Sequence, residues 1–356
     1  MLGPIPSRGR LLGWLDAQAR ALVVLTALPD SNLPAKLVGR VTPRPRVADE
    51  PMGGVPATLF RPGRGRSWPG LVFVNGVTAE GRRHPRVLRL AEGLARAGFL
   101  VCVPDPAGLA RGPIDERTVK ATTAAIGAVA DRSDVRGGRV GLIGVSLGAS
   151  LALLAAEDEG LVDRVGIVAG IAPFADFVNV LRLATTGREP PTFLALVSAR
   201  SLVATLPASA ERDVLLGRLE ELPPHTADAF APLRADHADD GVRAVAELLL
   251  NRDARRFDAL YAALSAQTRT RIAALSPIPR PGRLRAKVEL AVGPSDAYLP
   301  LAELTAISRA ATRTDVRLTV TSALGHAVPS LRPSGVAGLA RLDGWLVRSL
   351  RAARMS

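Results

Sequence analysis

One serine lies in a sequence context that is typical of a catalytic nucleophile. Ser146 is the centre of Gly144-Val145-Ser146-Leu147-Gly148, which follows the apolar run Val140–Ile143 and precedes the apolar segment Leu151–Ala156. We therefore expect a strand, a sharp turn and a helix. Small residues two positions before and after the nucleophile let strand and helix approach closely. The turn would also place the Leu147 amide at a helix N-terminus, where the dipole favours an oxyanion.

A serine hydroxyl is a weak nucleophile until a base removes its proton, so the site needs a histidine. The chain has four histidines: His84, His225, His237 and His326. His326 directly follows the last predicted strand, Val316–Thr321. Loops at the carboxyl ends of parallel strands share one edge of a sheet with the serine turn. We therefore predict that His326 is the base.

The third residue should be a carboxylate that orients the histidine from another carboxyl strand end. Asp296 fits, because it follows the apolar run Val288–Val292 in a Gly-Pro-Ser-Asp turn, and one helix and one strand fit between it and His326. Asp176, after the strand Arg164–Ala169, is the rival, from a position that some triads of this type use. We favour Asp296 for its turn context, since Asp176 could instead cap a helix.

Alternating strand and helix patterns predict how these residues are positioned. The expected strands of the sheet are Leu71–Asn75, Phe99–Pro104, Arg139–Ile143, Arg164–Ala169, Lys287–Val292 and Val316–Thr321. The helical patterns are Pro85–Ala97, Glu116–Asp131, Leu147–Glu157, Leu299–Thr312 and Ser334–Arg351. This rhythm predicts an α/β fold with a mainly parallel sheet flanked by helices. Short antiparallel strands are expected before it, at Val38–Thr42 and Val55–Phe60.

A long interval late in the sheet breaks this alternation. Residues 174–285 contain apolar helical patterns separated by proline pairs, and no convincing strand. A helical cap inserted between two strands explains the interval better than a loop of that length. We therefore divide the chain into an N-terminal helix and linker (1–54), the first part of the core (55–173), the cap (174–285) and the second part of the core (286–356).

Composition and charge narrow the classes of function. The chain has 356 residues, 47% of them apolar, and a formal net charge of +13. The surplus lies mainly before residue 120, without the basic and aromatic interleaving of a base-stacking groove, so we expect no nucleic-acid partner. With four histidines and the single Cys102, no metal-ligand cluster is apparent. Cys102 lies in an apolar run and is expected to be buried.

The N-terminal segment indicates where in the cell we expect the protein to lie. Leu11, Trp14, Leu15, Leu22 and Leu25 recur at helical spacing. Asp16, Gln18 and Arg20 interrupt them, which argues against a secretion signal. We expect an amphipathic helix packed on the domain of a cytoplasmic protein, and leave open a weak peripheral contact with a membrane surface through this helix.

The order Ser146, Asp296, His326 and the turn around Ser146 together resemble the α/β-hydrolase superfamily. The resemblance covers roughly residues 55–173 and 286–350, with the cap where family members carry a variable lid. It implies a second oxyanion donor, the amide of Val77, in a loop that opens with Asn75-Gly76 where many members have His-Gly. It also implies acyl transfer through a covalent acyl-enzyme, with no cofactor and no metal.

These expectations favour a serine hydrolase of the carboxylesterase type, acting on a small-molecule acyl substrate with a hydrophobic portion. Phe174, Phe177, Leu181, Leu183, Phe193 and Leu194 of the cap would either cover the pocket or pack the cap's own core. Two alternatives stay open: a membrane-surface lipid hydrolase or acyltransferase, and a binding protein that has kept the fold without the activity. Substrate-binding residues and oligomeric state are not readable from the sequence.

Overall fold

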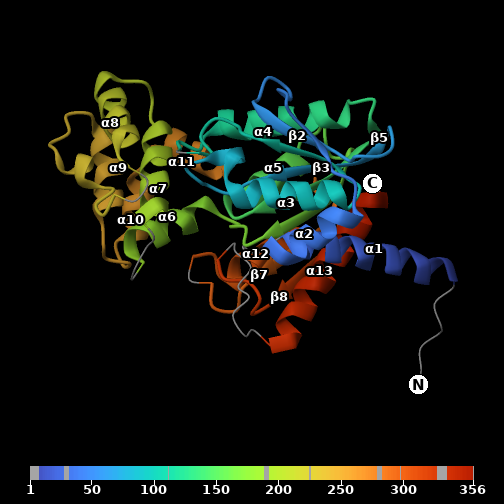
Figure 1. The fold of residues 1–356 in the computed structure, drawn as a ribbon. Coiled ribbons are helices and arrows are strands. Elements are labelled where there is room, and N and C mark those ends of the chain that lie inside the picture. Colours follow the sequence, from blue (N-terminus) through green and yellow to red (C-terminus); the bar gives the residue numbers. More distant parts are fainter. Residues whose placement is uncertain are drawn as a thin grey trace.

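An eight-stranded sheet forms the centre of the fold (Figure 1). The computed structural model describes residues 8–27, 32–110, 112–187, 192–223, 226–278, 283–296, 298–326 and 335–355. The strands, with their bounds, are β1 (Arg46–Asp49), β2 (Ala57–Arg61), β3 (Trp68–Val74), β4 (Leu100–Pro104), β5 (Val135–Val145), β6 (Val165–Ile171), β7 (Lys287–Val292) and β8 (Val316–Val320).

The sheet is mainly parallel, which confirms the predicted α/β class. Its strand order is β1-β2-β4-β3-β5-β6-β7-β8, and only the β1–β2 and β2–β4 pairs are antiparallel. Strand β4 lies beside β3 on one side, and the next strand of the chain, β5, lies beside β3 on the other. The direction in which strands are added to the sheet therefore reverses at β3. Ligands of open α/β sheets bind outside the carboxyl strand ends at such a reversal. The carboxyl ends of β3 and β5 are therefore where a site is expected.

Helices cover both faces of this sheet, because strands that are buried on two sides need apolar partners on each. On one face α3 (Pro85–Arg96) and α13 (Gly335–Met355) contact the strands, and α1 (Arg8–Ala27) packs on both of these helices. On the other face α4 (Glu116–Ala130) and α5 (Leu147–Ala156) pack on β5 and on each other. A further helix, α12 (Leu301–Ala310), contacts β8.

Between β6 and β7 the chain forms a helical lobe, at the left of Figure 1. Its helices are α6 (Phe177–Thr186), α7 (Thr192–Ala204), α8 (Ala210–Glu221), α9 (Asp240–Leu250), α10 (Phe257–Ala263) and α11 (Ala266–Ala273). The fully buried Arg200 of α7 donates to the carbonyls of Leu219, Glu220 and Leu222, where α8 ends. This guanidinium provides hydrogen bonds to carbonyls at the C-terminal end of α8, where helical amide partners run out.

The expected strand at Val38–Thr42 is wrong, because the chain forms α2 (Asn32–Val41) there. The edge strand is β1, and it begins only after Pro43 and Pro45. Proline has no amide hydrogen for the ladder, so pairing with β2 starts once both prolines are passed. Val41, the last residue of α2, is 81% exposed.

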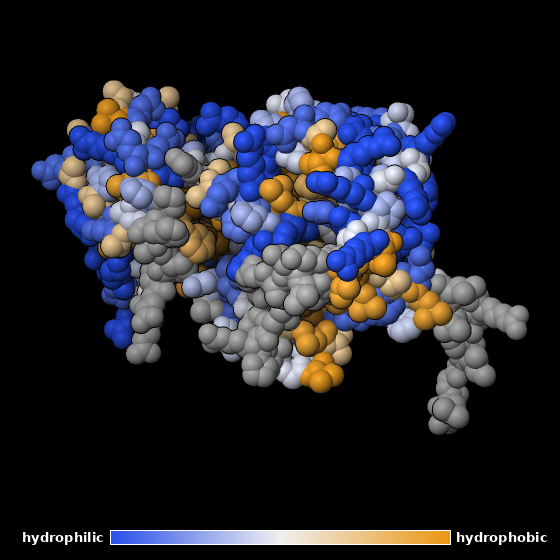
Figure 2. Space-filling model, viewed as in Figure 1, coloured by the Kyte–Doolittle hydropathy of each residue, from blue (hydrophilic) through white to orange (hydrophobic). Residues whose placement is uncertain are grey.

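Helix α1 lies where the N-terminal helix was expected. Among the described residues, no helix is long and apolar enough to cross a membrane. One side of α1 buries Ala17, Ala21 and Val24, while Trp14, Leu15 and Leu22 are about half exposed. Figure 2 shows apolar surface in the region of α1 and α13. Contact of this surface with a membrane stays a prediction.

Candidate active site

The turn between β5 and α5 presents Ser146 at the carboxyl edge of the sheet. Ser146 has φ +53° and ψ −126°, a strained conformation for a residue with a side chain. Its amide donates to the carbonyl of Ile171 at the end of β6 over 2.7 Å, and its own carbonyl accepts from the amides of Ala149 and Ser150. Neighbouring elements therefore hold the strained backbone of the serine in place.

Steric limits explain the two glycines around Ser146. A Cβ on Gly144 would lie 2.3 Å from Cα of Ala149, and one on Gly148 would lie 2.2 Å from the carbonyl oxygens of Val74 and Asn75. Real Cβ atoms do not approach backbone so closely, so any larger residue would force strand and helix apart. The close approach of Gly148 also brings the start of α5 against the end of β3.

His326 joins Ser146 to a buried carboxylate. Its Nε2 lies 3.5 Å from Oγ of Ser146, and its Nδ1 lies 3.0 Å from both carboxylate oxygens of Asp296. A carboxylate only accepts hydrogen bonds, so it keeps the imidazole proton on Nδ1 and leaves Nε2 to accept from the serine hydroxyl. At 3.5 Å, the Oγ–Nε2 contact lies at the long end of hydrogen-bond distances. The structure thus brings the three predicted residues together.

Asp296 is shielded from solvent and held ionised. Its side chain is fully buried, and its Oδ1 accepts from the amides of Tyr298 and Leu299, each over 3.0 Å. Burial by itself would raise the pKa of Asp296, but hydrogen bonds from His326 and from the Leu299 and Tyr298 amides outweigh it and hold this pKa below its ordinary value. The carboxylate is therefore charged at neutral pH.

Asp176, the rival acid, has a different environment. It is the N-cap of α6, where its Oδ1 accepts from the amide of Val178 and from the hydroxyl of Ser276. The loop that carries it is fixed to the core by Glu303 of α12, which accepts from the amides of Ala175 and Asp176. The Asp176 carboxylate accepts from an amide in the first turn of α6, while Asp296 is the acid in contact with His326.

Two backbone amides, those of Leu147 and Val77, are the candidate oxyanion donors. Leu147 is the first residue of α5, so its N–H has no partner within the helix. Val77 follows Gly76, where an added Cβ would lie 3.0 Å from the Val145 carbonyl and 3.4 Å from Cβ of Ser146. The buried Asn75 holds this loop through Nδ2, which donates to the hydroxyl of Thr78. The roles of both amides stay predictions.

An aromatic contact on His326 went unpredicted. The ring of Tyr298 packs edge-on against the imidazole, with centroids 4.7 Å apart and planes at 84°. Phe193 of α7 also packs edge-on against Tyr298, with centroids 6.4 Å apart and planes at 84°. Tyr298 therefore links the lobe to the histidine. Its position two residues after Asp296 was visible in the sequence, but nothing there indicated which way the ring points.

We expect Tyr298→Ala to lower kcat by about 2- to 10-fold, because edge-to-face aromatic pairs contribute about 0.5–1.5 kcal/mol. Tyr298→Phe keeps the ring against His326 and Phe193, and should stay near the native kcat. Steady-state kinetics of both variants on one chromogenic ester measures this. Equal kcat values for the Ala and Phe variants would show that the ring does not restrain the imidazole.

The remaining chemically active residues lie elsewhere. His84 caps α3 through Nδ1, and His237 contacts Glu211 and the Leu233 carbonyl within the lobe. His225 lies outside the described residues. Burial raises the pKa of the Cys102 thiol to about 12, so it stays protonated. Within the described residues no group of acidic, histidine and cysteine side chains is arranged to hold a metal ion.

The apolar residues singled out in the segment between β6 and β7 are buried to different degrees. Phe174, Phe177 and Leu181 are buried, and the first two rings pack on each other at 5.8 Å. Phe193 is only partly buried and reaches Tyr298. Phe193 is thus connected to His326 through the ring of Tyr298.

The chain matches a known protein family over most of its length. A model of the alpha/beta hydrolase family matches residues 71–339. The chain belongs to the alpha/beta hydrolase family. The matched range contains the Ser146 turn, the lobe, Asp296 and His326. No curated protein matches the sequence of this alpha/beta hydrolase.

Solved structures share the alpha/beta hydrolase fold at low sequence identity. The rice cell wall degrading esterase LipA of Xanthomonas oryzae is 17% identical with a TM-score of 0.51, over 85% of this chain and 87% of that one. DcsB, solved with a substrate analogue, is 14% identical with a TM-score of 0.50, over 88% and 100%.

A third solved structure belongs to a longer protein. The acylaminoacyl peptidase of Pyrococcus horikoshii is 13% identical with a TM-score of 0.47. The alignment covers 82% of this chain but only 39% of the peptidase.

Proposed function

We propose that this alpha/beta hydrolase is a serine hydrolase that cleaves carboxylic esters through an acyl-enzyme. The observation that carries the proposal is the continuous contact from Ser146 Oγ through His326 to the buried Asp296. A serine, a base in reach and a carboxylate that orients the base are the arrangement that activates an alcohol for acyl transfer. A protein that only bound ligands would have no need of a buried, ionised acid behind the histidine.

Each residue then has one role in the reaction. Nε2 of His326 takes the hydroxyl proton while Oγ of Ser146 attacks the ester carbonyl, and Asp296 stabilises the imidazolium. The amides of Leu147 and Val77 bind the oxyanion of the tetrahedral intermediate, each lowering the barrier by about 3 kcal/mol. The alcohol leaves with the proton from His326, and water hydrolyses the acyl-enzyme by the same route.

The substrate proposed is an ester with an apolar portion. Phe193 and Tyr298 form an aromatic edge between the lobe and His326, and Val77, a partly buried apolar residue, follows Gly76, which lies close to Ser146. Apolar walls with few polar groups are typical of small-molecule sites. The shared fold of the esterase LipA agrees with an ester, while thioesters and lactones present the same carbonyl to Ser146.

Rapid mixing with p-nitrophenyl esters tests this function. If an acyl-enzyme forms and its hydrolysis is slower, p-nitrophenol is released in a burst whose amplitude equals the enzyme concentration. Esters with acyl chains from acetyl to dodecanoyl should all acylate Ser146, with kcat/KM rising as apolar length increases. Absence of turnover and burst on the whole series, for folded protein, would refute ester hydrolysis.

A further inference from the structure

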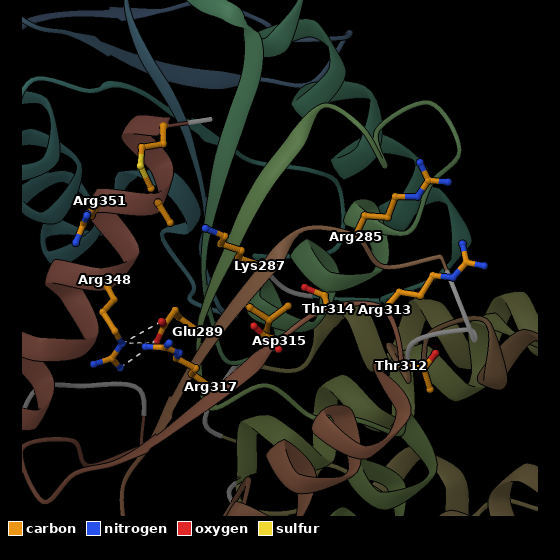
Figure 3. Close-up of a pocket in the computed structure, with 13 residues that line it drawn as sticks. Arg285, Lys287, Glu289, Thr312, Arg313, Thr314, Asp315, Arg317, Arg348 and Arg351 are labelled. Atoms are coloured by element: carbon orange, nitrogen blue, oxygen red, sulfur yellow. Dashed lines mark hydrogen bonds and ion pairs between the residues drawn. The ribbon is translucent and has the colours of Figure 1, made fainter. Parts of the chain in front are cut away.

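A basic pocket of about 730 Å³ lies at the edge of the sheet opposite to Ser146 (Figure 3). It forms where β7 and β8 begin, beside the loop that precedes β8 and the last turns of α13. Asp296 and His326 follow the other ends of the same two strands. The six residues of β7 span about 20 Å, so this pocket is separate from the candidate active site.

Positive side chains dominate the lining of this pocket. The lining contains two carboxylates, Glu289 and Asp315, and six cationic residues: Arg285, Lys287, Arg313, Arg317, Arg348 and Arg351. The pocket therefore has a local surplus of positive charge. Its cationic side chains come from two strands, two loops and one helix. A small molecule that carried several negative charges would meet cations from several directions.

Two of the six cations are already paired. Nη2 of Arg348 lies 2.9 Å from Oε2 of Glu289 and also donates to the Thr319 hydroxyl, and Figure 3 shows the bonds to Glu289. Arg285 pairs with Asp163, which does not line the pocket. In the part of the chain that the structure describes, Lys287, Arg313, Arg317 and Arg351 form no ion pair. Asp315 offsets one of these four charges.

This arrangement has the properties of an anion site. Arg348 is held in a fixed orientation by the nearly buried Glu289, while the four unpaired cations, Lys287, Arg313, Arg317 and Arg351, are exposed. Like charges around one hollow repel each other, and a bound anion would relieve that repulsion. The planar guanidinium groups match the geometry of phosphate oxygens. Val288, Ala352 and Met355 add an apolar part, which suits a phosphate attached to carbon.

We propose that this pocket binds a phosphate-bearing anion, as a free small molecule or as a lipid headgroup. Phosphate esters carry close to two negative charges at neutral pH, which matches the surplus of unpaired cations. The pocket volume leaves room for more than a single phosphate group.

Calorimetric titration with inorganic pyrophosphate at constant ionic strength tests the site. The double variant Arg313→Gln/Arg317→Gln removes two unpaired cations from the pocket. The control Arg66→Gln/Arg218→Gln removes two exposed cations elsewhere and so has the same net charge. We expect saturable binding to the native protein and the control, and a Kd at least about tenfold higher in the pocket variant. Substitutions at exposed positions should leave folding intact, which circular dichroism verifies.

Sedimentation with vesicles distinguishes the two sources of phosphate. Vesicles of equal parts phosphatidylcholine and phosphatidic acid are compared with pure phosphatidylcholine. Binding to the mixed vesicles that the pocket variant alone loses identifies a lipid headgroup, and pyrophosphate binding without vesicle binding identifies a free molecule. If the native protein binds neither probe, or if both double variants lose binding equally, no specific anion site exists.

Discussion

Ser146→Ala is expected to lower kcat for ester hydrolysis by about 10⁴-fold or more, because the attacking oxygen is removed while the rest of the site stays in place. Serine and alanine both carry a Cβ at φ +53°, so the substitution adds no backbone strain. Residual turnover would come from water attacking an ester that the two oxyanion amides still polarise. Steady-state kinetics on a p-nitrophenyl ester measures the loss.

Ser209→Ala is the matched control for this serine. Ser209 caps α8 in the lobe by accepting from the amide of Arg212, far along the chain from the candidate site. Its loss should cost about 1 kcal/mol of stability and leave kcat near native. Retention of native kcat by Ser146→Ala would refute the role of this residue.

Asp296→Asn is expected to lower kcat by about 10⁴-fold, the size of loss known when a triad acid becomes an amide. An asparagine can donate to Nδ1 of His326, which moves the imidazole proton to Nε2 and leaves no acceptor for the serine hydroxyl. Asp176→Asn is the matched comparison. Asparagine is as good an N-cap as aspartate, so α6 should persist and kcat should change by less than about twofold.

Kinetics of the two amide variants decides between the acids. A large loss at Asp176 with little loss at Asp296 would place the catalytic acid after β6 rather than after β7. Comparable small losses in both would show that neither carboxylate orients His326 during the reaction.

Stability against pH gives a second readout of Asp296. Because its pKa is lower in the folded protein, ionised Asp296 stabilises the fold above about pH 4, the range of an unfolded aspartate. That contribution is lost as pH falls through the lowered folded pKa. The free energy of unfolding of the native protein should therefore fall more steeply on acidification than that of Asp296→Asn, as urea titrations would show.

Much of the core could be predicted, because its determinants are local. Continuous apolar runs between glycine and proline turns mark strands buried on both faces, and parallel order follows from the helices between them. That order places the residues after β5, β7 and β8 at one edge, which is why Ser146, Asp296 and His326 were found from their positions. The structure brings these side chains into contact without assigning their roles.

Other features depend on contacts that a sequence does not encode locally. The prediction at Val38–Thr42 failed because so short an apolar pattern does not distinguish a helix from a strand, and the prolines at 43 and 45 decide where the edge strand starts. The orientation of Tyr298 depends on packing between the loop after β7, the loop after β8 and the lobe. Likewise, only packing distinguishes Phe177, buried in the lobe, from Phe193, which reaches Tyr298.

Covalent labelling by a fluorophosphonate tests the central claim most directly, because this probe reacts far faster with a serine that a neighbouring base activates than with an ordinary serine. Mass spectrometry of the digested protein locates the adduct. We predict one equivalent of label on the peptide that contains Ser146 in the native protein, and none in Ser146→Ala. Absence of label on folded native protein, or undiminished labelling of the variant, would contradict an activated nucleophile at this position.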